Sequence, residues 1–203
     1  MMAFRNLIKR DYDMSDIIQG CRLKKEKFQE LLYKNLAPKI LTLCRRYETR
    51  DFDAYDILQD TFIAVFEHFD QYDDSKASVE TWIKRIAVNT ALKKIRQQKQ
   101  HFVEIDTLDY ELHEWDDNDD ENSRFNHLTE EQIIAEIQKL PVGYRTVFNM
   151  FVIDGFSHKD IAAELGITET TSKTQFFKAK KMLKGQILSK IGEYEPKMSF
   201  VKG

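Results

Sequence analysis

Residues 155–183, GFSHKDIAAELGITETTSKTQFFKAKKML, carry the signals for two helices joined by a very short turn. Ser157 stands where a side-chain oxygen caps a helix, and Asp160 follows three residues later in the capping-box position. Gly166 comes directly after the last residue of the apolar pattern, where a left-handed backbone ends a helix. Thr168 can then cap a second helix. The stretch therefore predicts a helix-turn-helix.

The second of these helices has an apolar face and an opposite face that suits a DNA groove. In a helix-turn-helix, the second helix enters the major groove, where hydroxyls and long donors reach base edges. Basic residues farther along the helix reach phosphates. The residues expected to face outward are Lys173, Thr174, Phe177, Lys178 and Lys181. The alternative is an ordinary helical hairpin whose lysine face is merely solvated.

Two further helices are predicted before this motif. Thr129 and Gln132 form a capping box, which is a strong signal for a helix start. Pro141 suits the first position of the following helix, because proline lacks the N–H that is unsatisfied there. Together with the helix-turn-helix, these elements predict a C-terminal domain over residues 128–192 and a short tail over residues 193–203.

An abrupt change in composition precedes this domain. Residues 101–127 contain ten acidic residues and a single basic one, Arg124, without a sustained helical period. Such a composition predicts a solvated linker. A calcium loop is disfavoured, because a loop beginning at Asp116 would have Glu121 where glycine is needed and His127 where a bidentate glutamate is needed.

The N-terminal half also has helical periodicity. After a loose tail over residues 1–14, a short helix is predicted from Ser15 and a longer one over residues 23–47, which Pro38 should kink or split. A further helix is predicted over residues 53–69.

The last helix of this half, after the polar stretch 71–78, carries a basic stripe. Arg85, Asn89, Lys93 and Arg96 fall at i, i+4, i+8 and i+11, so they share one face. Residues 82–100 contain six basic residues and no acidic one. The sequence therefore predicts an all-α chain in which an acidic linker separates two small helical domains, each with a basic helix.

Composition limits the function classes. The chain has 203 residues, of which 42% are hydrophobic and 32% charged, and its net charge is -3. No apolar run approaches the ~18 residues of a membrane span, and the first residues do not form a secretory signal, so we expect a cytoplasmic protein without membrane insertion. The two cysteines and five histidines lie at no metal-ligand or catalytic-triad spacing. We therefore expect no metal, no cofactor and no catalysis.

Two segments resemble conserved regions of bacterial RNA polymerase sigma factors of the extracytoplasmic-function group. Residues 54–98, AYDILQDTFIAVFEHFDQYDDSKASVETWIKRIAVNTALKKIRQQ, resemble the second region, and residues 140–183, LPVGYRTVFNMFVIDGFSHKDIAAELGITETTSKTQFFKAKKML, resemble the fourth. The resemblance implies that core RNA polymerase and promoter DNA are the partners. It assigns the minus-10 element to residues 15–100 and the minus-35 element to residues 128–192. The resemblance leaves open whether an anti-sigma factor binds.

The resemblance also implies roles for individual residues. It assigns polymerase binding to Asp56, Gln59 and Asp60. It assigns the minus-10 element to Lys76, Trp82, Arg85, Asn89, Lys93 and Arg96, with loop 71–78 holding a flipped base. It assigns base contacts in the minus-35 element to Lys173, Thr174 and Phe177, and backbone contacts there to Thr171, Gln175, Lys178 and Lys181. Trp82 lies on an apolar helical face, so a core position is favoured over a wedge that melts DNA.

The recognition helix departs from the family pattern at four positions. Thr170 replaces the usual glycine, Ser172 the usual buried valine, and Gln175 and Lys178 replace arginines. We expect the Ser172 hydroxyl to bond to the carbonyl one turn back. The missing arginines weaken any inference about base preference, because neither replacement reproduces the two-pronged contact of arginine with guanine.

Two questions stay open at the level of sequence. The acidic linker is either a spacer or, as the resemblance implies, a strand in the RNA exit channel of the polymerase, and the two interpretations are compatible. The alternative function is a stand-alone helix-turn-helix repressor or activator. The linker argues against it, because ten carboxylates would penalise binding to free DNA.

Overall fold

The structure is a computed structural model that describes residues 12–97 and 129–194. The predicted acidic linker and most of both predicted tails lie outside the described residues. Within these two ranges the chain forms helices and no β-strand, so the all-α prediction is confirmed. The contacts divide the chain into two compact units, Met1–Cys44 with Tyr55–Thr90 and Arg45–Ala54 with Ala91–Gly203.

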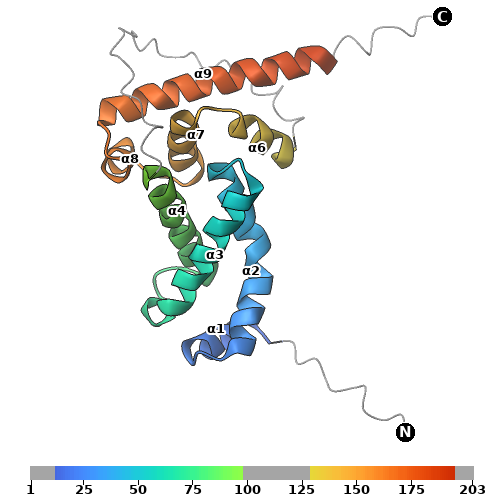
Figure 1. Cartoon of the computed structure of the whole chain (residues 1–203), viewed down its shortest axis with the longest axis vertical. Coiled ribbons are helices and arrows are strands. Elements are labelled where there is room, and N and C mark those ends of the chain that lie inside the picture. Colours follow the sequence, from blue (N-terminus) through green and yellow to red (C-terminus); the bar gives the residue numbers. More distant parts are fainter. Residues whose placement is uncertain (1–11, 98–128, 195–203) are drawn as a thin grey trace, which may run out of the picture. The chain divides into compact units, whose positions relative to one another are not determined.

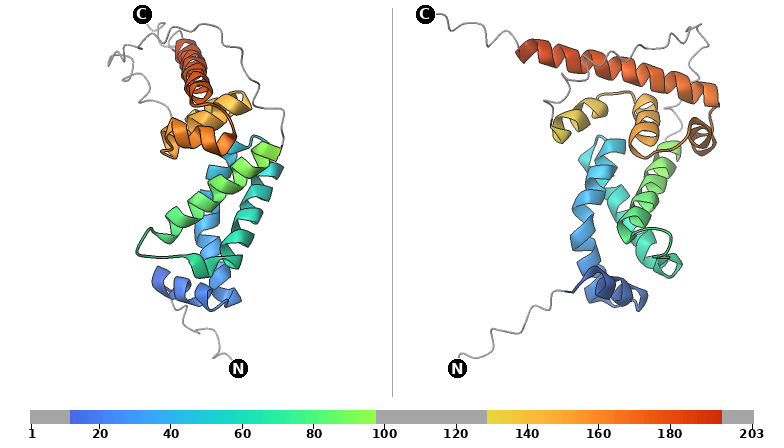
Figure 2. Two further views of the ribbon diagram at one scale, coloured as in Figure 1. Left: turned by 90° about the vertical axis from the view of Figure 1, so that its left-hand side faces the viewer. Right: turned by 180° about the vertical axis from the view of Figure 1, so that it is seen from behind.

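The first unit contains α1, η1 and most of three longer helices. The bounds are α1 (Met14–Arg22), α2 (Glu26–Tyr47), α3 (Asp51–Glu67), the 3-10 helix η1 (Phe69–Gln71) and α4 (Val79–Gln97). Figures 1 and 2 show α2, α3 and α4 side by side, with α1 next to the beginning of α2. The side chains between the long helices include Leu32, Leu58, Phe62 and Ile83, all at most 3% exposed. The predicted apolar stripes therefore form the core of this unit.

Pro38 does not split its helix, which was one of the two predicted outcomes. Helix α2 continues through Pro38 without a break, because the ring removes only one backbone donor and buried Leu36 and Ile40 on either side hold the helix in place. The boundary with α1 also differs from the prediction. Lys24 adopts a positive φ of 53°, so residues 23–25 form a turn and α2 begins at Glu26.

The second unit is built around one long helix. Its helices are α6 (Glu130–Gln138), α7 (Val142–Phe148), the π-helix η2 (Asn149–Ile153), α8 (His158–Leu165) and α9 (Glu169–Tyr194). Contacts with α9 come from α6, α7 and α8, which lie along one side of it in Figure 1. The apolar cluster between them contains Ile137, Leu140, Phe148, Ala179, Leu183 and Ile187.

Local signals for the helix boundaries of this unit are confirmed. The capping boxes predicted at Thr129 and Ser157 are both present. Gly166 ends α8 in the left-handed conformation, with φ 67°. Pro141 is the residue before α7 rather than its first residue.

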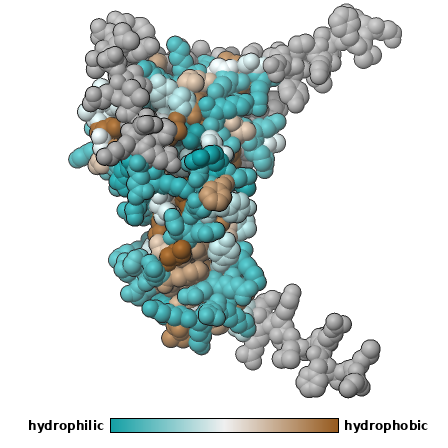
Figure 3. All heavy atoms as spheres, viewed as in Figure 1, coloured by the Kyte–Doolittle hydropathy of each residue, from teal (hydrophilic) through white to brown (hydrophobic). Residues whose placement is uncertain are grey.

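One apolar prediction fails in the π-helix. Helical periodicity over residues 144–152 predicts that Phe151 and Val152 lie on the buried face of one α-helix, but their exposed fractions are 36% and 52%. A π-helix has more residues in each turn than an α-helix, so the side chains after Asn149 shift to another face. These residues add to the small apolar patches that interrupt an otherwise hydrophilic surface, of which Figure 3 shows one side.

Candidate nucleic-acid interface

The predicted basic stripe lies on the surface of α4. Arg85, Asn89, Lys93 and Arg96 are all exposed. The opposite face of the helix is buried, with Ile83 fully covered. Helix α4 therefore presents the cations of Arg85 and Lys93 and the amide of Asn89 to solvent on one face, which fits a single strand or a duplex backbone. The Arg96 guanidinium on the same face donates to the Glu164 carbonyl at 3.0 Å.

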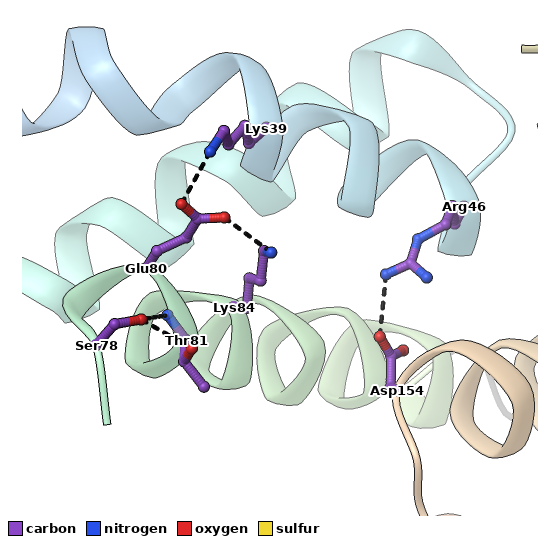
Figure 4. A network of polar contacts seen from close by, with 7 residues as sticks. All are labelled: Lys39, Arg46, Ser78, Glu80, Thr81, Lys84 and Asp154. Carbon is purple, nitrogen blue, oxygen red and sulfur yellow. Dashed lines mark hydrogen bonds and ion pairs between the residues drawn. The ribbon is translucent and has the colours of Figure 1, made fainter. Parts of the chain in front are cut away.

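Two other basic residues of α4, Lys84 and Lys94, pair with carboxylates of the protein instead. Lys84 and Lys39 both donate to Glu80, each at 2.9 Å, which ties the first turn of α4 to α2 (Figure 4). These hydrogen bonds, that of Lys84 first, hold the pKa of the Glu80 carboxyl below its usual value. Lys94 lies 3.4 Å from the buried carboxylate of Asp53. The sequence counts Lys84 and Lys94 among the basic residues of this helix, and the structure shows that both pair with carboxylates of the protein.

The loop that enters α4, residues 72–78, has a defined conformation. The Tyr72 hydroxyl donates to the Ala77 carbonyl at 3.1 Å, which closes the loop across its two ends. The Asp73 carboxylate accepts from the backbone N–H of Ser75 at 3.0 Å and from its hydroxyl at 2.6 Å. We call this segment the entry loop. Its internal hydrogen bonds give it a fixed shape before any ligand binds.

Two predicted minus-10 residues lie at this loop. Lys76 is exposed and pairs with Asp73 at 3.3 Å. Trp82 is half-buried, with its ring centroid 5.6 Å from that of Phe69 and 5.2 Å from that of Tyr72. The aromatic packing agrees with a core position for Trp82. Its ring also packs against Tyr72, the first residue of the entry loop.

The recognition helix α9 begins with a hydroxyl cap. The backbone N–H of Thr171 donates to the Thr168 hydroxyl oxygen at 3.0 Å, and the two hydroxyls lie 2.8 Å apart. Thr171 is thus part of the cap. Lys173 is exposed and pairs with Glu169 at 2.7 Å, one helical turn before it. This pair must open before Lys173 can contact a base.

The remaining outward residues of α9 differ in exposure. Lys181 is exposed, while Thr174, Phe177 and Lys178 are half-buried. Gln175 corrects a prediction: its side chain is only 2% exposed. It lies on the buried side of α9, one turn before Ala179, so it does not belong to the DNA-facing surface.

A second correction concerns Ser172. Its hydroxyl lies 2.9 Å from Nδ1 of His158, the first residue of α8, and the expected bond to a carbonyl of its own helix is replaced by this contact. The His158 ring stacks on Phe151 with centroids 4.2 Å apart and an angle of 13° between the planes. Burial lowers the pKa of His158, and Lys173 lowers it further, while Glu169 opposes the shift. The sequence gives no local signal for this contact, because its partners belong to different helices.

The predicted polymerase-binding residues lie together on α3. Gln59 and Asp60 are exposed and Asp56 is half-buried. Phe52 and Ile63 flank them on the same helix, 77% and 55% exposed. Leu58 and Phe62 of the same helix are buried, at 2% and 3% exposure. The outer face of α3 is therefore a mixed acidic and apolar strip, the type of surface that docks on protein.

Among the described residues, no group of three or more histidine, cysteine, aspartate or glutamate side chains could hold a metal ion. None of their helices combines the length and the apolar character needed to cross a membrane.

Family models match both halves of the chain. The model described as Sigma-70 region 2 matches residues 32–101, and the model described as Sigma-70, region 4 matches residues 130–183. The chain belongs to the sigma-70 family. The two matched segments contain the basic stripe and the recognition helix, in that order.

Several relatives of this sigma factor are ECF RNA polymerase sigma factors. The ECF RNA polymerase sigma-E factor of Haemophilus influenzae is 27% identical over 169 residues, which cover 80% of this chain and 88% of the relative. The ECF RNA polymerase sigma factor SigW of Bacillus subtilis is 28% identical over 171 residues, covering 77% and 85%. A solved structure of the sigma factor RpoE with the anti-sigma factor NepR from Bartonella quintana is 17% identical, covers 79% of this chain and 96% of that chain, and gives a TM-score of 0.46.

The protein is therefore an extracytoplasmic-function sigma factor of RNA polymerase and not a stand-alone repressor. Two family models in the family order, together with relatives aligned over most of their length, distinguish these alternatives. A helix-turn-helix alone would not have done so.

Proposed function

We propose that this sigma factor binds core RNA polymerase through the outer face of α3 and directs it to promoters through α4, the entry loop and α9. It supplies binding and specificity, while the polymerase supplies the chemistry. It acts in the cytoplasm, at the nucleoid when bound to polymerase. The observation that carries the proposal is the exposed stripe of Arg85, Asn89, Lys93 and Arg96 beside a preformed loop, within the segment that matches region 2.

The stripe and the loop suit an unpaired strand. Holding a base outside the duplex costs a few kcal/mol of unstacking, which a pocket must recover through donors, stacking and backbone contacts. Arg85 and Lys93 supply cations for the backbone, and Asn89 supplies an amide for a base edge. The entry loop and the Trp82 ring lie at the start of the same helix. Melting and capture of the minus-10 element are therefore assigned to this surface.

Helix α9 is assigned to the minus-35 element. Its cap at Thr168 and the tight turn at Gly166 fix its beginning relative to α8, as a groove-reading helix requires. Lys173 and Thr174 lie within the first two turns, where side chains reach base edges, and Lys178 and Lys181 lie farther along for phosphates. Because each lysine that contacts a phosphate releases a condensed counterion, the contribution of these contacts is expected to depend strongly on salt.

Start-site mapping tests the function directly. Core polymerase without a sigma factor is mixed with the purified full chain and fragmented genomic DNA, and the 5′ ends of the transcripts are sequenced. We expect discrete start sites that share upstream minus-10 and minus-35 motifs. Start sites no different from those of core polymerase alone would overturn the proposal.

A salt titration tests the assignment of the stripe. Lys93→Ala should reduce the slope of log affinity against log salt by about 0.7 for a single-stranded minus-10 probe bound by the holoenzyme, the value of one lost phosphate contact. Lys34→Ala is the matched control, because it removes the same charge from α2, where Lys34 pairs with Glu30. Equal changes in slope for both variants would refute the contact at Lys93.

A gel shift with and without core polymerase tests whether the chain acts through the enzyme. We expect specific binding to promoter DNA only in the presence of core polymerase. Strong specific binding by the chain alone would contradict the proposed mode of action.

A further inference from the structure

Arg22, the last residue of α1, reaches the entry loop from outside. Its Nη2 atom donates to the Tyr72 carbonyl at 3.3 Å and lies 3.7 Å from Oδ2 of Asp74. Its Cζ atom lies 6.0 Å from the centroid of the Tyr72 ring. One guanidinium thus contacts the backbone, a carboxylate and an aromatic ring at the beginning of the loop. These contacts join residues about fifty positions apart in the sequence.

The helix that carries Arg22 is itself fixed to the core. Ile17 and Cys21 are 2% and 1% exposed. Gly20 meets α2 so closely that an added Cβ would lie 2.1 Å from Cγ of Phe28. Helix α1 also contacts η1, the segment immediately before the loop. Because packing fixes the backbone of α1, the Arg22 guanidinium can restrict the movement of the entry loop.

The contact also compensates charge where DNA is expected. The entry loop contains two adjacent carboxylates, Asp73 and Asp74. Lys76 pairs with the first at 3.3 Å, and Arg22 lies beside the second. A single strand carries a negative charge on every phosphate, so an uncompensated carboxylate in the loop would repel it. Arg22 offsets this repulsion at the same point where it holds the Tyr72 carbonyl.

We propose that Arg22 is a positioning residue for the unpaired minus-10 base, acting through Tyr72 and Asp74 to keep the entry loop in its base-receiving conformation. This inference rests on the proposed function, in which the loop receives that base. Arg22 does not contact the base itself. Without it, the loop keeps its internal hydrogen bonds but loses the contact with α1, so the position of the loop is less constrained.

The test uses holoenzyme assembled from the full chain and core polymerase. The probe is a fluorescent single-stranded oligonucleotide with the minus-10 sequence found by start-site mapping, carrying an abasic site at each position in turn. With the natural chain, an abasic site at the captured position should weaken binding about tenfold, because stacking and edge contacts of one base are lost. With Arg22→Ala, the penalty at that position should fall to about twofold or less, while penalties at other positions stay unchanged.

Further variants separate positioning from a general structural effect. Arg22→Lys should restore part of the penalty, since it keeps a charge beside Asp74 but loses the fork that also reaches the Tyr72 carbonyl. Arg22→Gln, which keeps most of the side-chain length without the charge, should behave like Arg22→Ala. Lys34→Ala is the charge-matched control and should leave every penalty unchanged. Binding to core polymerase should be the same for all five proteins.

The outcomes are distinguishable. A uniform loss of affinity at all positions in Arg22→Ala would reduce Arg22 to a structural residue and overturn the inference. A position-specific penalty that survives unchanged in Arg22→Ala would overturn it as well, while leaving the proposed function intact. If the natural chain showed no position-specific penalty, the base-receiving role of the loop and the role of Arg22 would both be refuted.

Discussion

The Nδ1 atom of His158 and the hydroxyl oxygen of Ser172 lie 2.9 Å apart, so a hydrogen bond joins the first residue of α8 to the recognition helix α9. Ser172 is fully buried, and the imidazole is stacked on Phe151. The polar contact therefore lies among apolar side chains, where an unpaired partner would be costly. Ile161 and Leu165 of α8 are also buried, so polar and apolar packing together hold α8 against α9.

Removal of this hydrogen bond should destabilise the helix-turn-helix. We expect Ser172→Ala to lower the free energy of unfolding of the second unit by about 1 kcal/mol, because the imidazole nitrogen loses its partner. The measurement is urea unfolding followed by circular dichroism. Ser189→Ala, the same substitution at an exposed position of α9, is the control and should have little effect. Equal losses in the two variants would contradict the role of the contact.

Stability of the second unit should fall in mildly acidic solution. Burial lowers the pKa of His158 in the folded state, so the unfolded chain binds a proton at this site more readily. The contribution of neutral His158 to the free energy of unfolding is therefore complete above the ordinary histidine pKa of about 6.5. It is lost as pH falls through the lower pKa of the folded state. Urea unfolding at pH 7.5 and 5.5 measures the effect. His158→Asn, which retains a polar group near the Nδ1 position, should reduce this difference, and an unchanged difference would exclude His158 as the cause.

Two glycines of the second unit should respond to alanine in opposite directions. Gly166 has φ 67° and Gly185 lies within α9, and an added Cβ would meet no atom within 4 Å at either position. Gly166→Ala should cost about 1 kcal/mol through backbone strain alone. Gly185→Ala should stabilise by about 0.5–1 kcal/mol, since alanine is the better helix former. Thermal unfolding of both variants checks the prediction, and changes of the same sign would contradict it.

The bridge at Glu80 should contribute modestly to the first unit. Glu80→Gln removes the charge that attracts Lys39 and Lys84, and we expect a loss of about 0.5 kcal/mol because the groups are partly exposed. The pKa of Glu80 is held below its usual value, so this contribution is present above the unfolded pKa of about 4.3 and disappears as pH falls through the folded value. Urea unfolding in low and high salt provides the measurement. The difference between Glu80→Gln and the natural chain should shrink in 1 M salt, where the Debye length is about 3 Å.

One substitution should affect promoter recognition alone, and another should affect polymerase binding alone. Lys173→Ala should lower transcription from a promoter with its minus-35 element, without weakening affinity for core polymerase, because Lys173 lies on the exposed side of α9. Asp60→Ala should weaken affinity for core polymerase while leaving the transcription supported by saturating sigma factor nearly unchanged. Fluorescence anisotropy with labelled sigma factor measures the affinity for core polymerase, and in vitro transcription measures promoter recognition. Equal loss of polymerase affinity in both variants would refute this division of roles.

The pairing of Lys173 with Glu169 leads to one more expectation. Glu169→Gln should increase affinity for the minus-35 element, because the lysine no longer has to leave a carboxylate 2.7 Å away before it contacts DNA. Holoenzyme binding to duplex promoter DNA measures the change. The increase should disappear in the Lys173→Ala background, and an increase that persists there would point to general charge repulsion instead.

The sequence by itself determined the helical fold class, several helix starts and ends, and the basic face of α4. The capping boxes at Thr129 and Ser157 and the glycine ending at Gly166 were predictable because each signal acts within one helical turn. The stripe from Arg85 to Arg96 was predictable because helical periodicity places its members on one face regardless of what packs behind them. The same periodicity failed at Phe151, where a π-helix changes the register.

Only the tertiary structure decided which polar residues serve the surface and which serve the fold. Lys39 of α2 bonds to Glu80 of α4, Gln175 is buried, and the Ser172 hydroxyl bonds to another helix. The support of the entry loop by Arg22 depends on a residue about fifty positions away. Local spacing encodes contacts within a few turns, because one helix fixes their geometry. Contacts between helices depend on how packed side chains position segments that are distant in the sequence. A local sequence pattern does not predict these contacts.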